Sequence, residues 1–543
     1  MTLADRSALT GLIDPSRDPR AVLGLVMLSF DGRSVPASVR ERMASAPAAG
    51  VTLYRGRNAA APDVVRALTD DLVAAAGGPL LIAADQEGGQ LDAFSDGATA
   101  FPGAMALGAV GDELLAERVG AATGLELRAM GVNVCYAPVL DLATDPAHPA
   151  LGIRSFGSDP AAVSRLGAAT IRGLAASGVA ATAKHFPGSG GLVTDSHHRL
   201  GLIAHDRERF HDVELAPFRA AIGARVPLVM SGHVSVPALT GRSDVPATLS
   251  RAVLHDLLRD ELGFDGLVIT DALDMGALAQ GSLLIVDVLA AIAAGVDLLL
   301  LGDPADRDDL EAGLVHAARR GLVDRAALAA SLGRIDALRS RLAGIPVPDP
   351  SIVGSPAHRE LARAVAERSI TLVRDDAGLI PLRLDSNSEI LAVMPEPADL
   401  TPADTSSSVQ PGLADAMRRH HPRVRELVVP QLPTDGEIAA VRQAAADADL
   451  VVLGTISASL QPAQAALARA VVEVASRTVT VALRAPFDLW VYPSASTHLC
   501  AYGIRPPTLA ALARVMFGEL APTGRLPAPI PDLYPVGWRH AID

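Results

Sequence analysis

The chain has 543 residues, of which 49% are hydrophobic, and a formal net charge of −14. A chain of this length and hydrophobicity is expected to fold into two or three globular domains and is too apolar to be disordered. The acidic balance and the lack of any basic run exclude the clustered cationic face that nucleic acid requires, so the expected partner is a small molecule.

The N-terminus and the apolar runs predict a cytoplasmic protein without a membrane span. The first residues, MTLADRSALTGLIDPSRDP, carry scattered charges and no continuous apolar region, so we expect no signal peptide. The longest apolar stretch, residues 283–302, contains Asp287 and Asp297, which favours a core helix followed by a buried strand. Cys135 and Cys500 lie in separate apolar runs and are predicted to be buried thiols.

Short apolar runs in the first part of the chain predict a parallel barrel. Helix-like segments such as residues 112–130 and 160–178 lie between most of these runs. Continuous apolar strands that alternate with amphipathic helices are typical of a parallel sheet covered by helices. We therefore predict a (β/α)8 barrel over residues 1–342, with strands near 22–28, 50–55, 80–85, 133–141, 181–185, 227–233, 266–271 and 296–303.

A proline-rich stretch, residues 343–358, interrupts this pattern and is predicted to be a linker. Apolar runs then alternate again with helical or loop segments over residues 359–543, which predicts a smaller α/β sandwich with helices on both faces of its sheet. Its strands are expected near 368–375, 389–395, 450–456, 478–484 and 498–503.

Most of the barrel strands end in a polar residue. The active site of a barrel lies at the C-terminal ends of its strands, so these residues are candidates for function, although some are expected to be helix caps or ion-pair partners. They are Arg55, Asp85, Asp141, Lys184, His185, His233 and Asp271.

The glycine-rich stretch KHFPGSGGLVTDSHH, residues 184–198, contains the most informative of these ends. It matches neither phosphate-loop pattern, and Pro187 breaks the esterase pattern Gly-x-Ser-x-Gly, so Ser189 is expected to be a turn residue. Its histidines lack the spacing of known zinc motifs, so we expect no metal. A carboxylate two residues from an imidazole can hold its tautomer, which makes Asp195 and His197 candidates for acid/base chemistry.

Several long motifs resemble the family 3 glycoside hydrolases, in order and in spacing. They are LIAADQEGGQLDAF, YAPVLDLATDPAHPALGIRSFGSDP, KHFPGSGGLVTDSHH, VMSGHVSVPAL and LGFDGLVITDALDMGAL in the barrel, and ERSITLVRDDAGLIPL and FGELAPTGRLPAPIP in the second domain. The motifs look most like the bacterial β-N-acetylhexosaminidase branch of that family, in its two-domain form.

The resemblance implies a role for each matching position. Asp271 matches the nucleophile of a retaining double displacement, His197 the acid/base of this branch, and Asp195 its dyad partner. No metal or organic cofactor is implied. The residues that match hydrogen-bonding partners of the sugar are Asp85, Arg154, Lys184 and His185.

Other interpretations of nearby residues stay open at this point. Asp274 is a rival nucleophile that is expected to begin a helix instead, and His198 is expected to be a solvated neighbour of His197. Arg154 could be a structural ion-pair partner. His233 could line the site or support it from behind.

Three positions depart from the family pattern. Gln90 and Ala93 stand where the branch generally has arginines, and Ser189 stands where it has a histidine. The reaction type is therefore better supported than the sugar specificity.

The sequence thus predicts a cytoplasmic retaining exo-β-glycosidase that releases a terminal N-acetylglucosamine-type sugar, with cell-wall fragments as the source that the branch implies. A β-glycoside phosphorylase, a β-glucosidase-type specificity and a catalytically silent sugar-binding protein are the alternatives, and the oligomeric state is left open.

Overall fold

The computed structural model of the protein describes residues 18–305 and 307–541, so most of the segment behind the signal-peptide prediction lies outside the described residues. An eight-stranded parallel sheet forms the core of the first part, in the order β11-β9-β7-β6-β3-β2-β1-β12. A single bridge between Ile269 and Leu298 brings its two edges together into a nearly closed barrel, as predicted. The strands are β1 (Val26–Leu28), β2 (Gly50–Leu53), β3 (Leu81–Ala84), β6 (Val134–Cys135), β7 (Ala180–Phe186), β9 (Leu228–Ser231), β11 (Leu267–Thr270) and β12 (Leu299–Leu300).

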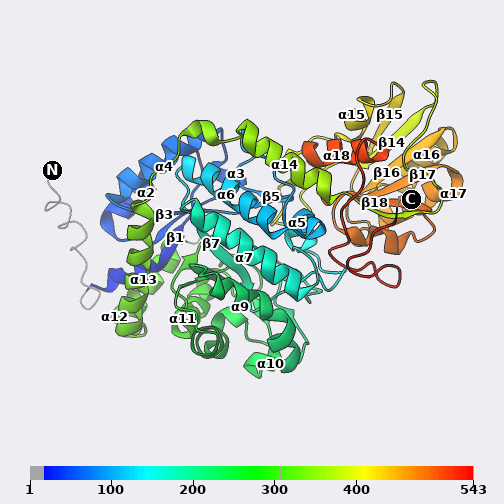
Figure 1. Ribbon diagram of the computed structural model, residues 1–543. Helices are drawn as coiled ribbons and strands as arrows, with labels where there is room; N and C mark the ends of the chain where they lie inside the picture. Colours follow the sequence, from blue (N-terminus) through cyan, green and yellow to red (C-terminus); the bar gives the residue numbers. More distant parts are fainter. Residues whose placement is uncertain (1–17, 306, 542–543) are drawn as a thin grey trace.

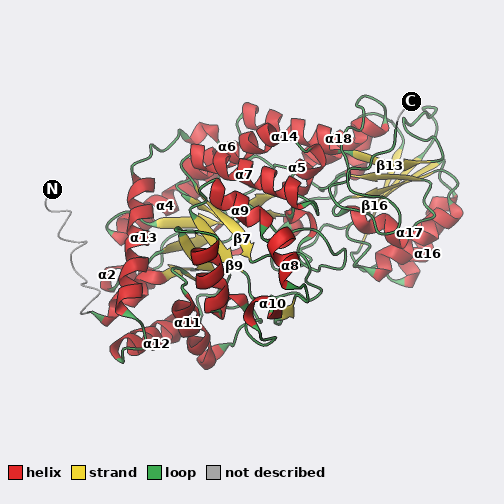
Figure 2. Ribbon diagram, turned by 60° about the horizontal axis from the view of Figure 1, so that its bottom comes forward, coloured by secondary structure: helices red, strands yellow, loops and turns green. Residues whose placement is uncertain are grey.

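Helices surround this barrel, as Figures 1 and 2 show. The predicted core helix and strand in residues 283–302 are confirmed. Helix α11 (Leu284–Ala294) is followed by Gly295, which caps it in a left-handed conformation, and then by β12. The main helices are α2 (Ala37–Ser45), α3 (Arg55–Asn58), α4 (Pro62–Ala76), α5 (Ala104–Val110), α6 (Glu113–Ala129), α7 (Pro160–Ala176), α8 (Arg207–Arg209), α9 (Ala216–Gly223), α10 (Pro237–Thr240), η5 (Ala252–Glu261), α11 (Leu284–Ala294), α12 (Arg307–Arg319) and α13 (Arg325–Ala343).

Three predicted strands are much shorter than expected, and in one of them, residues 296–303, β12 spans only Leu299–Leu300. In residues 22–28 only the last three form β1, because the side chain of Asp18 caps a 3₁₀ helix, η1 (Pro19–Leu25), by accepting from the backbone N–H of Arg20. In residues 133–141 the regular strand ends at Cys135, and Pro138, which lacks an N–H, interrupts the ladder before Val139 pairs with Lys184.

The second domain contains a six-stranded sheet with helices on both faces, which confirms the predicted α/β sandwich. The order is β13-β18-β17-β16-β14-β15, and β13 alone is antiparallel to its neighbour. Side chains alternate along β14: Leu391 and Val393 pack with α16 and α17, whereas Ala392 and Met394 pack with α15 and α18. The elements are α14 (Pro356–Ser369), β13 (Thr371–Asp375), β14 (Ile390–Pro395), α15 (Leu413–Arg418), β15 (Val424–Val429), α16 (Asp435–Ala446), β16 (Leu450–Thr455), α17 (Pro462–Val474), β17 (Thr478–Ala482), β18 (Thr497–Cys500) and α18 (Pro506–Met516).

Strand β15 is absent from the predicted set. It lies at the edge of the sheet, and its central residues, from Arg425 to Val428, are exposed or half-buried. An edge strand of this kind does not produce the continuous apolar run that identifies a buried strand.

The predicted linker runs from the end of α13 into α14 and is bound to the barrel. Glu126 of α6 is buried and accepts hydrogen bonds from Gly354 N (3.0 Å), His358 Nδ1 (2.7 Å), and both the N–H and the hydroxyl of Thr99. Helix α14 contacts α5 and α6 of the barrel and α18 of the second domain. The exact domain boundaries stay a prediction.

Both cysteines are buried and free, as expected. Within the described residues, no helix has the length and apolarity that crossing a membrane would require.

Candidate active site

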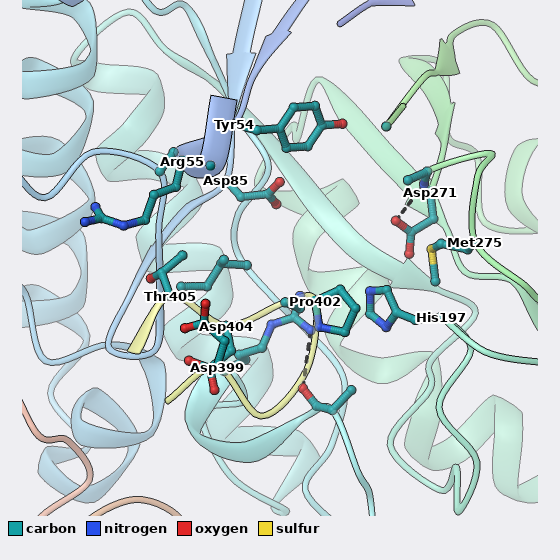
Figure 3. A pocket seen from close by; sticks show the side chains of 18 of the residues that line it. Tyr54, Arg55, Asp85, His197, Asp271, Met275, Asp399, Pro402, Asp404 and Thr405 are labelled. Atoms are coloured by element: carbon teal, nitrogen blue, oxygen red, sulfur yellow. Dashed lines mark hydrogen bonds between the residues drawn. The ribbon is translucent and has the colours of Figure 1, made fainter. Parts of the chain in front are cut away.

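A cavity of about 820 Å³ opens at the C-terminal ends of the barrel strands. Figure 3 shows Asp85, His197 and Asp271 around it, together with residues of the second domain. All seven predicted site residues line this cavity, although they come from five separate stretches of the chain: Asp85, Arg154, Lys184, His185, Asp195, His197 and Asp271.

A buried network of charges holds the sugar-binding candidates. The Lys184 ammonium lies 2.6 Å from Asp85 Oδ1 and 2.6 Å from Glu87 Oε1, and its side chain is only 2% exposed. Arg154 forms a two-pronged ion pair with Glu87, at 2.8 and 2.9 Å. Arg154 is thus an ion-pair partner, and the same side chain also lies in the cavity wall, while its contact with a sugar stays a prediction.

Glu87 is the centre of this network. Burial alone would raise the pKa of Glu87, but Arg154 and Lys184 outweigh it and lower this pKa to about 2. Burial likewise opposes the charge of Lys184, yet Asp85 and Glu87 raise its pKa above the ordinary value. Glu87, Arg154 and Lys184 are therefore charged at neutral pH. The side chain of Asp85 is 24% exposed and lines the cavity.

Asp271 lies directly after β11 and lines the cavity. Its Oδ1 accepts from the N–H of Ala272 (2.8 Å), and its Oδ2 lies 3.9 Å from His185 Nε2. Burial alone would raise the pKa of Asp271, but the imidazoles of His185, His233 and His197 and the Ala272 N–H outweigh it, so the pKa falls below its ordinary value. The carboxylate is ionised at neutral pH, which a nucleophile needs.

His197 of the predicted dyad lies on the same side of the cavity as Asp271 (Figure 3), and both dyad residues line the cavity. His197 Nδ1 is 2.6 Å from Asp195 Oδ1, which also accepts from the backbone N–H of His197. The segment that carries the dyad packs on the residues after β11, because Gly276 N donates to His197 O (2.9 Å) and Ala277 N donates to Ser196 O (3.2 Å).

The turn at Ser189 acts through its backbone, consistent with the predicted turn residue. Its N–H donates to Asp141 Oδ1 (2.6 Å), and its carbonyl lies 3.1 Å from His148 Nε2. A Cβ on the next residue, Gly190, would lie 1.9 Å from Leu142 O. Close packing therefore requires this glycine.

The second domain lines the same cavity, which the sequence left open. Its contribution is the loop after β14, residues 399–408 (Figure 3). Thr405 donates through its N–H (2.8 Å) and its hydroxyl (3.1 Å) to Gln90 O, and this hydroxyl also accepts from Asp92 N.

The departures Gln90 and Ala93 lie at this contact between the domains. The side chain of Gln90 accepts from Ile153 N (3.1 Å), and Ala93 is buried in the cavity wall. Nearby, Arg505 of the second domain donates to Gly89 O (2.9 Å) and pairs with Asp92 (2.7 Å). Residues 86–92 form a short hairpin of β4 (Gln86–Gly88) and β5 (Leu91–Asp92). The second domain therefore supplies a cation beside this hairpin, near the positions where the family pattern has arginines.

The remaining candidates have other environments. Both ring nitrogens of His233 have partners, Thr248 Oγ1 at 2.8 Å and Ala272 O at 3.1 Å, so this residue lines the cavity and supports the chain after Asp271. Asp274 also lines the cavity but is exposed, and His198 is exposed outside the cavity wall.

Sequence reasoning missed Glu87, the holding role of Asp141 and the second-domain loop. Glu87 lies in the motif LIAADQEGGQLDAF, and Asp141 is one of the polar strand ends. The sequence does not show which side chains these carboxylates contact, so neither residue could be distinguished from a helix cap. The loop after β14 follows the C-terminal end of a parallel strand, which is where ligand-binding loops of open α/β sheets are found.

Known proteins share this architecture. The sequence profile described as "Glycosyl hydrolase family 3 N terminal domain" matches residues 25–338. The chain is 30% identical over 509 residues to a β-hexosaminidase A of Pseudoalteromonas piscicida, covering 83% of each protein. It is 35% identical over 329 residues to a β-N-acetylglucosaminidase/β-glucosidase of Cellulomonas fimi, covering 58% of this chain and 57% of that protein. The structure of a family 3 β-N-acetylglucosaminidase from Paenibacillus sp. FPU-7 superposes with a TM-score of 0.88 and 35% identity, over 94% of this chain and 98% of the other.

A barrel with a carboxylate- and imidazole-lined cavity, to which a second α/β domain contributes, together with these matches defines the protein as a glycoside hydrolase. The extent of these matches identifies it further. The chain belongs to glycosyl hydrolase family 3, and it resembles the family's β-hexosaminidases.

Proposed function

We propose that this protein is a retaining exo-β-glycosidase that hydrolyses terminal β-linked N-acetylglucosamine-type sugars. The observation that carries the proposal is the His197–Asp195 dyad, bonded at 2.6 Å, in the same cavity as the ionised carboxylate of Asp271. The names of the relatives from Pseudoalteromonas and Paenibacillus support this sugar class.

In the first step, an oxygen of Asp271 attacks the anomeric carbon while the bond to the leaving group breaks. His197 donates its proton to the leaving oxygen, so the alcohol departs neutral and a covalent glycosyl-enzyme forms. In the second step, His197 accepts a proton from water, whose oxygen attacks the anomeric carbon and releases Asp271. Two inversions retain the β configuration.

Asp195 accounts for how an imidazole can act in both steps. Burial alone would raise the pKa of Asp195, but its bonds from His197 outweigh it and lower this pKa, so Asp195 stays ionised. The carboxylate therefore accepts from Nδ1–H and stabilises the imidazolium while Nε2 exchanges the proton. The charged groups of Asp85, Lys184 and Arg154 suit hydrogen bonding to sugar hydroxyls.

A panel of aryl β-glycosides, with N-acetylglucosaminide, glucoside, xyloside and galactoside, tests the proposal. The parent is expected to prefer the N-acetylglucosaminide, and Asp271→Asn and His197→Ala are expected to lose activity by at least ~100-fold. Proton NMR of the first product is expected to detect the β-anomer. Parental kcat/KM in both variants would contradict the assignment of the two residues.

The name of the Cellulomonas relative favours a β-glucosidase-type specificity as the second candidate. A preference for the glucoside in the panel would select it. Adding phosphate tests the phosphorylase alternative, because sugar 1-phosphate as the main product would exclude hydrolysis as the principal reaction. A catalytically silent protein would turn over none of the four glycosides.

A further inference from the structure

Asp141 is a buried carboxylate behind the cavity wall. Its side chain is fully buried, and it is not among the residues that line the cavity, so it does not touch a sugar bound there. The backbone brings it to this position, because Val139 pairs with Lys184 and Leu140 N donates to Lys184 O (2.6 Å). The next residue along, Asp141, therefore lies opposite His185.

The two oxygens of Asp141 serve two different parts of the site. Oδ2 lies 2.6 Å from His185 Nδ1, and Oδ1 accepts from Ser189 N at 2.6 Å. The backbone N–H of His185 is a weaker third donor, at 3.3 and 3.4 Å. Burial alone would raise the pKa of Asp141, but His185 and the Ser189 amide outweigh it and lower this pKa below its ordinary value.

The first contact sets the orientation of the His185 ring. An ionised carboxylate is an acceptor only, so Nδ1 must carry a proton, and Nε2 is directed at Asp271 Oδ2, 3.9 Å away. Asp141, Asp271, His148 and His233 are among the titratable groups that interact electrostatically with His185.

The second contact holds the start of the segment that carries the dyad. Ser189 begins the stretch that leads to Asp195 and His197, and the far end of this stretch is held by Gly276 N at His197 O. The segment is thus held near both of its ends, by Asp141 behind the cavity wall and by the residues that follow Asp271.

We propose that Asp141 is a positioning residue that couples the sugar-binding His185 to the segment carrying the acid/base His197. A single rigid carboxylate fixes both, so a change at Asp141 disturbs sugar contact and proton transfer together. This inference rests on the proposed function, in which His197 is the acid/base.

Replacing Asp141 by Asn makes the role measurable with little change in volume. An amide has one oxygen and one NH₂, so it cannot accept from both Ser189 N and His185 Nδ1–H. If its oxygen keeps Ser189, its NH₂ faces Nδ1, and the proton of a neutral His185 must move to Nε2, toward Asp271.

The experiment compares the parent with Asp141→Asn and Asp141→Ala, using phenyl and 2,4-dinitrophenyl N-acetyl-β-glucosaminides. The dinitrophenolate leaves without protonation, so it does not need a positioned acid, whereas phenol does. We expect the kcat/KM of Asp141→Asn to fall about 100-fold with the phenyl glycoside. With the dinitrophenyl glycoside the loss in kcat/KM is expected to be at most ~10-fold, and the KM is expected to rise for both substrates. Asp141→Ala is expected to behave the same way, with a lower Tm.

Glu126→Gln is the matched control, because Glu126 also holds a histidine, His358, at 2.7 Å, but outside the cavity. It is expected to lower Tm and to leave kcat/KM for both substrates unchanged at temperatures well below Tm. An Asp141→Asn protein that resembles this control, or that loses equal activity with both leaving groups, would overturn the inference.

The same assay separates this inference from the proposed function. A parent that turns over neither glycoside, or an Asp271→Asn variant with parental activity, would contradict the proposed function itself. An active parent whose Asp271→Asn and His197→Ala variants are inactive, together with an Asp141→Asn protein of parental kinetics, would contradict the inference alone.

Discussion

Lys184 and Glu87 form a buried ion pair, with Nζ 2.6 Å from Oε1 and both side chains less than 5% exposed. Arg154 shares the same carboxylate, so one glutamate compensates two buried cations. Both cations lie in the wall of the cavity, so the stability of this region and its affinity for a sugar are expected to depend on Glu87, together with Asp85, which also pairs with Lys184.

Glu87→Gln is expected to destabilise the protein strongly. The substitution removes one of the two carboxylates, Glu87 and Asp85, that neutralise the charges of Lys184 and Arg154. Breaking a buried ion pair typically costs ~3–5 kcal/mol of stability. We expect a lower free energy of unfolding in urea and a higher KM, because both cations would shift. The control is Glu113→Gln, which breaks an exposed pair with Arg165 and should change the stability by less than ~1 kcal/mol. Equal effects of the two substitutions would contradict this prediction.

His148 is expected to make the stability depend on pH. Its Nε2–H faces Ser189 O, and its Nδ1 accepts from Ala150 N and Leu151 N, so the native contacts need the neutral ring. Burial lowers the pKa of His148 to about 4, from an ordinary 6.5. Between these values the unfolded chain binds the proton and the folded chain does not, so the stability falls as the pH drops from about 6.5 to about 4.

Urea unfolding of the parent and His148→Gln at pH 4.5 and 7 measures this contribution. We expect a smaller loss of stability on acidification in the variant, by up to ~1.4 kcal/mol for each pH unit in the window. His316→Gln, on the exposed face of α12, controls for the substitution itself. Identical pH dependence in the parent and His148→Gln would exclude the assignment.

Thr405→Val tests the contact between the second domain and the barrel. The substitution keeps the shape but removes the hydroxyl that bonds to Gln90 O and Asp92 N. We expect a loss of stability of ~1–2 kcal/mol and a higher KM with little change in kcat, since no predicted catalytic group is touched. Thr508→Val is the matched control, because this buried hydroxyl has no hydrogen-bond partner. The prediction fails if both variants have the parental KM.

Glu126→Ala is expected to weaken the attachment of the linker. It removes the acceptor for Gly354, His358 and Thr99 and leaves buried donors unpaired, at a cost of at least ~3 kcal/mol. Calorimetry should find a lower Tm, while kcat/KM well below Tm stays parental. Glu208→Ala, at an exposed position in α8, should leave Tm unchanged. A parental Tm for Glu126→Ala would be evidence against this attachment.

The sequence by itself determined the architecture and selected residues that line the cavity. Runs such as residues 266–271 predict buried parallel strands because both faces of such a strand are apolar, and β11 lies there. Asp85, Lys184 and Asp271 could be selected because a barrel collects its strand ends on one side, and the structure brings all three to the cavity. Strand β15 was missed because an edge strand has no such signature.

Only the tertiary structure decided which polar groups hold the others. Asp141 and His185 are separated by 44 residues and Gln90 and Thr405 by 315, and no local pattern indicates that either pair makes contact. Local periodicity records which face of an element is buried, because burial acts on each side chain separately. A hydrogen bond or an ion pair depends on the relative position of two elements within a few tenths of an ångström, and that position is set by the packing of the whole barrel and its second domain.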